Sequence, residues 1–332
     1  MRLALTLIAS CALLAACGGG SGDTPSSPSG SEQGTASAVV LTSSNYVPVA
    51  RQALASSSYV MGAGNFSSST QVNKSQPIVR NIEKSAAKLI NDSQHSILKS
   101  IEASEGCSLG GSISGGLDDR NGNNRMDAGD SYFLRFNQCR EDDEITNGEL
   151  RFTFHSTSGN INTELEPESY PFSLTVTASY ANLTTQSNTT RHEGSGSLHL
   201  TIQAQSPNER TTVIRTDELR TALTQNGRTT SQVLKNYEGQ WSLTPIYETN
   251  SVRGTIINSE FDSRTLYVQT PAPFKQDHAQ TYPSSGASLI TGAAGSQIRV
   301  TALDASSVQI ELDADGNGSF EIRTVHPWRD LM

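Results

Sequence analysis

From Cys107 to the end of the chain, apolar residues alternate with polar residues along many short segments. A period of two places every second side chain on one face of a β-strand. The alternating apolar residues are Leu150, Phe152 and Phe154; Phe172, Leu174 and Val176; Leu198, Leu200 and Ile202; Trp241 and Leu243; Ile298 and Val300; Val308, Ile310 and Leu312; and Phe320 and Ile322. The turn-forming pairs between several of these segments are Asn147-Gly148, Asn226-Gly227 and Asn317-Gly318. The pattern predicts an antiparallel meander of strands.

A glycine also recurs at intervals of 43 to 48 residues, shortly before an apolar strand residue. These glycines are Gly148, Gly196, Gly239 and Gly286. The spacing indicates either duplicated β units or ordinary turn chemistry at the starts of strands.

Two segments before Cys107 have helical spacing instead. Residues 48–58 place Val49, Ala53 and Leu54 on one side of a helix, and residues 77–101 repeat apolar residues at steps of three and four. Such a helix can bind a partner, but it more often covers the sheet of its own domain. The expected fold class is therefore mainly β (α+β). We expect an antiparallel meander forming a curved or barrel-like sheet over residues 107–327, with an N-terminal amphipathic helix from residues 38–106 packed on it.

The first sixteen residues have the form of a secretory signal peptide. Arg2 precedes an apolar run, residues 3–14, that is shorter than the roughly 20 residues of a membrane-spanning helix. Leu14-Ala15-Ala16-Cys17 resembles the bacterial lipobox, in which the cysteine is acylated and becomes the new N-terminus. The alternative is an ordinary signal peptide followed by a chance cysteine. The resemblance implies a signal peptide over residues 1–16 and a lipid on Cys17.

Residues 17–37 contain no large apolar side chain. A Gly/Ser/Pro segment of this kind cannot offset the entropy lost on ordering, so we expect a flexible tether with a reach of about 25 Å. Gly18, rather than an aspartate, follows the cysteine, which in the enterobacterial sorting rule resembles an outer-membrane destination. We therefore expect an outer-membrane lipoprotein attached through its N-terminal lipid. Whether it faces the periplasm or the cell surface is open.

The charge of the chain bears on its partners. Removal of the signal peptide takes away only Arg2, which changes the formal net charge from −9 to −10. An acidic protein has no electrostatic footprint for nucleic acid and is repelled by anionic lipid surfaces. No nucleic-acid partner is expected, and the identity of a protein or ligand partner stays open.

Two cysteines remain after signal-peptide removal and lipidation, Cys107 and Cys139. In an oxidising compartment such a pair forms a disulfide, and the alternative is two unrelated free thiols. If Asp118 and Asp130 close a hairpin, Cys139 faces Leu109, and one small bulge brings it to Cys107. The sequence thus predicts a disulfide at the base of this hairpin.

An acidic loop follows that first cysteine, and its oxygen-bearing side chains have a calcium-loop spacing. At loop positions 1, 3, 5, 9 and 12 stand Asp119, Asn121, Asn123, Asp127 and Asp130. Calcium takes six to eight oxygen ligands, and the spacing resembles the loop of dockerins. Position 6 is Asn124 rather than glycine, and the flanking residues resemble strands rather than helices. The alternative to a calcium site is an acidic hairpin loop without an ion.

A second acidic loop lies near the C-terminus. Its candidate ligands are Asp313, Asp315, Asn317 and Glu321. In the expected register Leu312 pairs with Phe320, which sets Glu311 directly opposite Glu321. Like charges in that position repel, and a bound calcium ion would remove the repulsion. The alternative is a solvated hairpin tip.

Sequence motifs for catalysis are missing. None of the six histidines has a metal-ligand spacing, and there is no nucleophile elbow, P-loop or dinucleotide fingerprint in its required context. We therefore expect no enzymatic activity.

The first hypothesis is a non-catalytic envelope lipoprotein acting in binding or assembly, with calcium-stabilised hairpins. The alternatives are a carrier of an apolar ligand in a curved β-sheet cavity and a polysaccharide or cell-wall hydrolase.

Two stretches carry a loose family resemblance. The first is Gly129-Asp130-Ser131-Tyr132-Phe133 leading to Phe136-Asn137-Gln138-Cys139 and then to Asn147-Gly148-Glu149-Leu150. The second is residues 282–293 leading to Asp313-Ala314-Asp315-Gly316-Asn317-Gly318. The chain is similar in these motifs to uncharacterised proteobacterial β-rich lipoproteins. The resemblance implies the architecture and no known activity.

Overall fold

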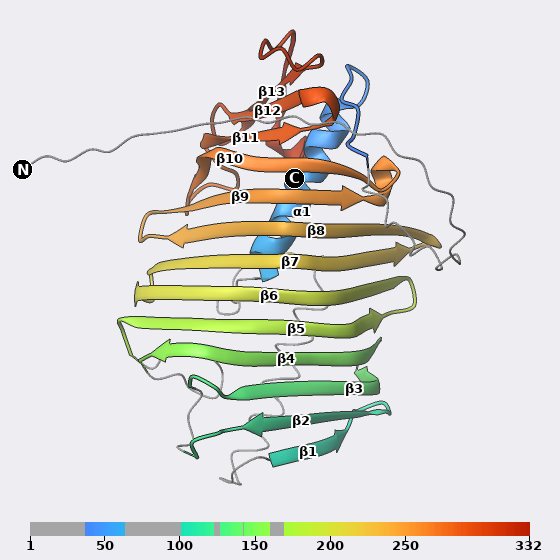
Figure 1. Ribbon diagram of the computed structural model, residues 1–332, viewed down its shortest axis with the longest axis vertical. Coiled ribbons are helices and arrows are strands. Elements are labelled where there is room, and N and C mark those ends of the chain that lie inside the picture. The colour runs from blue at the N-terminus through green and yellow to red at the C-terminus, as the bar shows by residue number, and fades with distance from the viewer. Residues whose placement is uncertain (1–36, 64–100, 123–126, 142, 160–168) are drawn as a thin grey trace, which may run out of the picture. The chain divides into compact units, whose positions relative to one another are not determined.

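The computed structural model describes residues 37–63, 101–122, 127–141, 143–159 and 169–332. Fourteen antiparallel strands in these residues form one sheet, and each strand pairs with its neighbours in sequence (Figure 1). The meander predicted from the alternating residues is therefore confirmed. The strand order runs from β1 to β14 without closing, so the sheet is open rather than a barrel.

Most strands are long and are joined by short turns. The strands are β1 (Ile101–Gly106), β2 (Ser112–Asp118), β3 (Ser131–Glu141), β4 (Glu144–Ser158), β5 (Phe172–Gln186), β6 (Thr190–Ser206), β7 (Glu209–Gln225), β8 (Arg228–Leu243), β9 (Tyr247–Asn258), β10 (Arg264–Asp277), β11 (Ser285–Thr291), β12 (Gln297–Ala302), β13 (Ser307–Asp313) and β14 (Ile322–Pro327). The helices are α1 (Tyr46–Ala63) and the 3-10 turns η1 (Ser259–Phe261), η2 (Ala293–Gly295) and η3 (Trp328–Asp330).

The two faces of the sheet differ in polarity. The face that we call inner carries the buried apolar side chains, among them Leu134, Leu150, Phe154, Leu198, Leu200, Ile214, Leu234, Ile256, Ile298, Val308, Ile310 and Leu312. The face that we call outer carries the polar residues between them, among them Arg135, Glu149, Thr177, His199, Arg215 and Glu238. The period of two in the sequence is thus the alternation between a core face and a solvent face.

The helix α1 crosses the inner face. At its start the Tyr46 hydroxyl lies 3.0 Å from Thr324 Oγ1 of β14, and near its end Ser57 Oγ accepts a 2.9 Å hydrogen bond from the Tyr237 hydroxyl of β8. Val49 and Ala53 are buried between these points. In Figure 1 the helix accordingly lies behind the strands from β8 upward. The helix predicted over residues 48–58 is confirmed and is longer than expected.

The helix predicted over residues 77–101 lies outside the described residues except for its last position. Ile101 is the first residue of β1, so the helical expectation is wrong at that residue. Residues Ala36–Met332, which include α1 and all fourteen described strands, form one compact unit.

Asn147 and Gly148 do not form the predicted turn but lie inside β4. The chain turns earlier, where Glu141 and Glu144 pair directly. Gly148 has a φ of 105°, and a Cβ atom built there would lie 2.4 Å from the carbonyl oxygen of Asn182 in β5. Glycine is needed here because the neighbouring backbone comes close, not because the chain reverses.

The same reason accounts for two more of the recurring glycines. A Cβ atom at Gly196 or Gly286 would also lie within 2.5 Å of backbone in the adjacent strand. The recurring glycines therefore mark places where the pairing of adjacent strands is irregular, and they are not evidence of duplicated units. By contrast, Asn226 and Gly227 form the predicted hairpin turn, with φ values of 51° and 77°.

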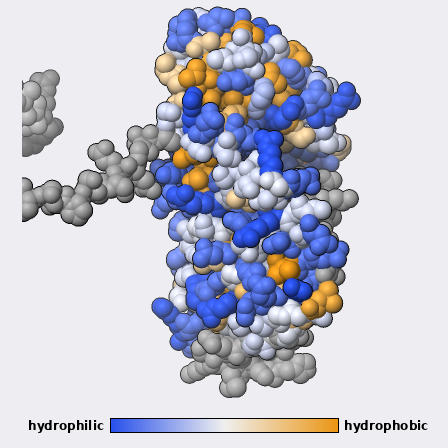
Figure 2. All heavy atoms as spheres, turned by 90° about the vertical axis from the view of Figure 1, so that its right-hand side faces the viewer, coloured by the Kyte–Doolittle hydropathy of each residue, from blue (hydrophilic) through white to orange (hydrophobic). Residues whose placement is uncertain are grey.

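The surface at the ends of the strands is mostly hydrophilic. Figure 2 views the molecule from the right-hand side of Figure 1 and shows hydrophobic residues gathered mainly toward the end that holds the last strands. None of the described helices combines the length and the apolar character needed to cross a bilayer.

Candidate functional site

The first acidic loop is held by two buried carboxylates. Asp130 is 0% exposed, and its two oxygens accept hydrogen bonds from the backbone N–H groups of Arg120 (3.0 Å) and Asp127 (2.8 Å). Asp119 is also buried, and its Oδ1 accepts a 2.7 Å bond from the N–H of Gly122. Burial raises the pKa of Asp130 above its ordinary value in spite of these bonds. Both carboxylates therefore serve to fix the loop backbone.

The other predicted ligands of this loop are arranged differently. The Asn121 side chain turns its amide nitrogen toward Asp127 and donates to both carboxylate oxygens at 2.9 Å. Asn123 lies outside the described residues. Among the described residues, Asp119, Asp127 and Asp130 do not bring three carboxylate oxygens within 4.8 Å of one another. Calcium at this loop stays a prediction.

The second acidic loop brings its carboxylates together. Oxygen atoms of Asp313, Asp315 and Glu321 all lie within 4.8 Å of one another. Asp313 ends β13 and is 1% exposed, whereas Asp315 and Glu321 are exposed. Three hard oxygen donors around one point are a partial calcium shell, which the loop carbonyls and water can complete.

Asp313 shapes the loop around this point. Its Oδ1 accepts hydrogen bonds from the backbone N–H groups of Gly316 (2.8 Å) and Asn317 (3.2 Å), and its Oδ2 accepts one from Gly318 (2.8 Å). The side-chain oxygen of Asn317, a predicted ligand, accepts a 2.7 Å bond from Ser319 N–H. The loop thus places three of the four predicted ligands together and uses Asn317 to hold the turn.

The predicted pairing of Glu311 with Glu321 is wrong. β14 begins at Ile322, which pairs with Leu312, so the register is two residues away from the expected one. Phe320 precedes the strand. In the observed register Glu311 lies opposite Arg323, and the repulsion expected between two glutamates does not arise.

Glu311 is instead a buried carboxylate paired with two partly exposed arginines. It is 1% exposed and accepts hydrogen bonds from Nε of Arg299 (2.6 Å) and Nε of Arg323 (2.8 Å) on the two neighbouring strands. The bond from Arg299, joined by that from Arg323, holds the pKa of Glu311 below its ordinary value. The Arg299 guanidinium also lies 4.1 Å above the ring centroid of Phe320. These contacts fix the strands that carry the second loop.

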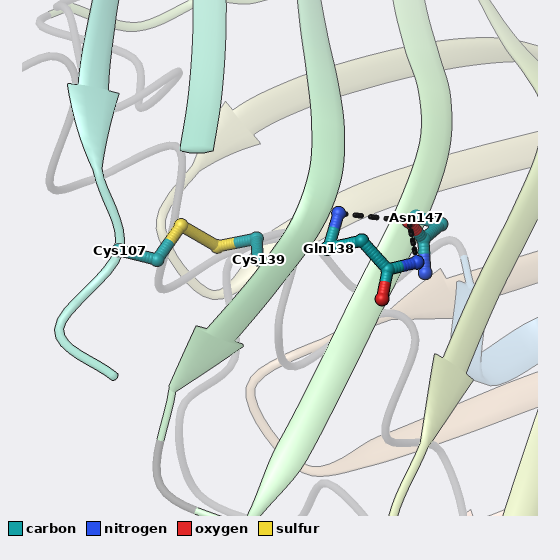
Figure 3. The surroundings of a disulfide bond; sticks show 4 residues. All are labelled: Cys107, Gln138, Cys139 and Asn147. Carbon is teal, nitrogen blue, oxygen red and sulfur yellow. Dashed lines mark hydrogen bonds between the residues drawn. A yellow bond between two sulfur atoms is a disulfide. The ribbon is translucent and has the colours of Figure 1, made fainter. Parts of the chain in front are cut away.

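The predicted disulfide is present. The sulfur atoms of Cys107 and Cys139 are 1.97 Å apart and their Cα atoms 5.4 Å apart (Figure 3). The hairpin register expected around it is off by one residue, since Asp118 pairs with Ser131 rather than with Asp130. A β-bulge lies at Gln138, whose φ is 49°, where the pairing of β3 with β4 shifts between Phe136 and Cys139. The backbone N–H (2.8 Å) and the side-chain amide (2.9 Å) of Gln138 donate hydrogen bonds to Asn147 Oδ1. The disulfide therefore joins the segment after β1 to the end of β3.

The outer face carries a feature that the sequence reasoning missed. Glu149, Glu218 and Glu238 each contact two cationic side chains, on the same or neighbouring strands. A spacing of two residues between opposite charges, as in Glu149-x-Arg151 and Glu218-x-Arg220, places both on one face of a strand. This spacing of charges can be seen in the sequence. The cross-strand partners depend on the register between strands, which the sequence reasoning did not predict.

No protein-family model matches this sequence, and comparisons with curated proteins and with solved structures find no significant match either.

Proposed function

We propose that this chain is an envelope lipoprotein, attached to the outer membrane through Cys17 and the tether of residues 17–37, whose β domain is a non-catalytic binding platform. The observation that carries the proposal is the polarity of the sheet. α1 packs on the inner face, while the outer face of β3–β9 presents cross-strand rows of hydroxyl, imidazole and charged side chains to solvent. A wide polar face on a rigid sheet is suited to binding a large partner.

The state of the outer-face carboxylates favours binding over catalysis. Partial burial raises the pKa of Glu238, but hydrogen bonds from Arg215 and Arg253 outweigh it and bring the pKa below its ordinary value. Glu218 is held low in the same way by Arg220 and Lys235. A carboxylate that stays ionised is a poor proton donor near neutral pH, so these groups suit charge pairing better than general acid catalysis.

We also propose that calcium stabilises the domain at the second acidic loop. The support is the grouping of Asp313, Asp315 and Glu321, whose oxygens converge where the loop of Asn317 turns. An ion there would offset the repulsion between three carboxylates and tie β13 to the start of β14.

A labelling experiment tests the binding platform. Gln240→Cys places a thiol at an exposed position of the outer face, and Thr189→Cys places one at an exposed turn as the matched control. Gln240→Cys should react with a maleimide in the purified protein but be protected in isolated envelopes, while Thr189→Cys should react in both. Equal reaction of Gln240→Cys in both preparations would contradict the proposal.

A second candidate is carriage of an apolar ligand against the inner face. Its support is the set of buried apolar residues on β3–β6, such as Leu134, Phe154 and Leu200. Native mass spectrometry of protein purified from envelopes tests it. A co-purifying lipid of constant mass would favour a carrier, and bare protein together with a protected Gln240→Cys would favour the platform.

A further inference from the structure

Three groups of charges on the outer face share one composition. Each has one glutamate and two cations: Arg135 and Arg151 with Glu149, Arg220 and Lys235 with Glu218, and Arg215 and Arg253 with Glu238. The N···O distances range from 2.6 to 3.4 Å. Each group therefore keeps one uncompensated positive charge, although the whole chain has a net charge of −9.

In the groups of Glu238 and Glu149 the cations are more exposed than the carboxylate. Side-chain exposure is 57% for Arg215 and 65% for Arg253, but 24% for the Glu238 between them. It is 58% for Arg135 and 25% for Glu149. A ligand approaching these two groups therefore meets guanidinium groups first, and the glutamate beneath each pair holds them in place.

One of these groups extends into a continuous row across six strands. His155 Nε2 of β4 lies 2.7 Å from Thr177 Oγ1 of β5, which lies 2.9 Å from His199 Nδ1 of β6. His199 pairs with Arg215 of β7, and Arg215 pairs with Glu238 of β8, which in turn pairs with Arg253 of β9. The row is a linear series of hydrogen-bonding groups with cations toward one end.

The next two rows on one side of it are rich in hydroxyl and amide groups. One consists of Thr175, Thr201, Val213, Gln240 and Ser251, and the next of Ser173, Gln203, Thr211, Ser242 and Thr249. Hydroxyls and amides can both donate and accept hydrogen bonds, which matches the hydroxyl groups of sugars. The face thus combines sites for sugar hydroxyls with paired cations that already bind a carboxylate.

We propose that the outer face of β4–β9 binds an acidic polysaccharide whose sugar units carry carboxylates. This deepens the binding role proposed above and rests on it. The free N–H groups of Arg215 and Arg253 bind the glycan carboxylates, and the neighbouring hydroxyl rows bind its sugar hydroxyls. The acidic loops at the strand ends and the negative charge of the whole chain limit indiscriminate attraction of polyanions.

Binding of the purified, detergent-solubilised lipoprotein to immobilised polygalacturonate, with dextran as the neutral glycan, tests this proposal. The wild-type protein should bind polygalacturonate and not dextran, and raising the salt concentration should weaken binding. Arg215→Gln with Arg253→Gln should weaken binding by about tenfold, the size expected for two exposed ion pairs. Arg228→Gln with Arg329→Gln removes the same charge from two exposed arginines elsewhere and should leave binding unchanged.

Glu238→Gln tests whether a loss of binding comes from the lost positive charges or from general disruption of the outer face. It removes the negative charge of the group but keeps an acceptor oxygen for the arginine N–H groups, so the variant should bind polygalacturonate at least as tightly as wild type. No binding to polygalacturonate, equal binding to dextran, or equal losses in the two double variants would each overturn the proposal. If Gln240→Cys is protected in envelopes while polygalacturonate does not bind, the platform stands and the glycan assignment fails.

Discussion

The carboxylate of Glu311 accepts a 2.6 Å hydrogen bond from Nε of Arg299, with the Glu311 side chain 1% exposed and that of Arg299 41% exposed. The free energy of burying this carboxylate is offset by its hydrogen bonds to Arg299 and Arg323. Removing the negative charge of Glu311 would weaken those hydrogen bonds. Arg323 of β14 donates a second bond to the same carboxylate, so Glu311 couples β12, β13 and β14.

Glu311→Gln should lower the free energy of unfolding by about 2 kcal/mol at pH 7, measured by urea denaturation. The folded-state pKa of Glu311 lies below the ordinary value of 4.5, so its stabilisation is present above that pH and is lost as the pH falls through the folded pKa. The difference between wild type and variant should therefore shrink in acid. Glu149→Gln, at a site that is 25% exposed, is the control and should cost less. Equal losses, or a difference independent of pH, would contradict this account.

The disulfide gives a second prediction. Intact-mass analysis after alkylation without reductant should find no free thiol at Cys107 or Cys139, and reduction should expose two. Cys107→Ser with Cys139→Ser should lose about 3–4 kcal/mol of stability, as expected from the chain entropy of a loop of 32 residues. Two alkylated thiols in the native protein would show that the bridge does not form.

Calcium should raise the melting temperature. An ion that binds only the folded state adds about 2.7 kcal/mol at a hundredfold excess over its dissociation constant. Differential scanning fluorimetry in millimolar calcium against chelator measures the rise. Asp315→Ala should abolish it, because this residue supplies a ligand and contacts the loop only through Asn317, whereas Asp313 also binds the backbone of Gly316 and Gly318. Asp119→Ala should leave it intact, and the opposite result would place the ion at the first loop.

The lipid anchor is tested by Cys17→Ser. Wild-type protein should partition with membranes and into detergent, whereas the variant should appear as a soluble form or an uncleaved precursor. Identical fractionation and electrophoretic migration of the two proteins would show that Cys17 is not lipidated.

The alternation of apolar and polar residues was sufficient to predict the meander, because it follows directly from which face of each strand is buried. The register between neighbouring strands was harder to predict than the order of the strands. The alternation predicts Phe320 as a strand residue opposite Leu312, but the loop after Asp313 is longer than a tight turn and Ile322 takes that position. A sequence shows which side chains face inward, yet a shift by two residues keeps every one of them on the same face.

Irregular strand positions were misread for a related reason. Asn147-Gly148 has the composition of a hairpin turn. In the structure these two residues lie within β4, beside the bulge at Gln138 of β3. Both environments favour Asn and Gly, so local composition alone does not separate them. The charge groups around Glu218 and Glu238 depend on partners from adjacent strands and could be found only once those pairings were known.

Among the described residues, the ladders of β1 to β14 all join strands that are neighbours in sequence, and the one pairing with a distant segment is the single bridge between Ala38 and Thr265 of β10. The sheet can therefore extend one hairpin at a time, in the order of synthesis. The same arrangement lets a hairpin be gained or lost during evolution without reordering the others, so the width of the sheet is a property that selection can change in small steps.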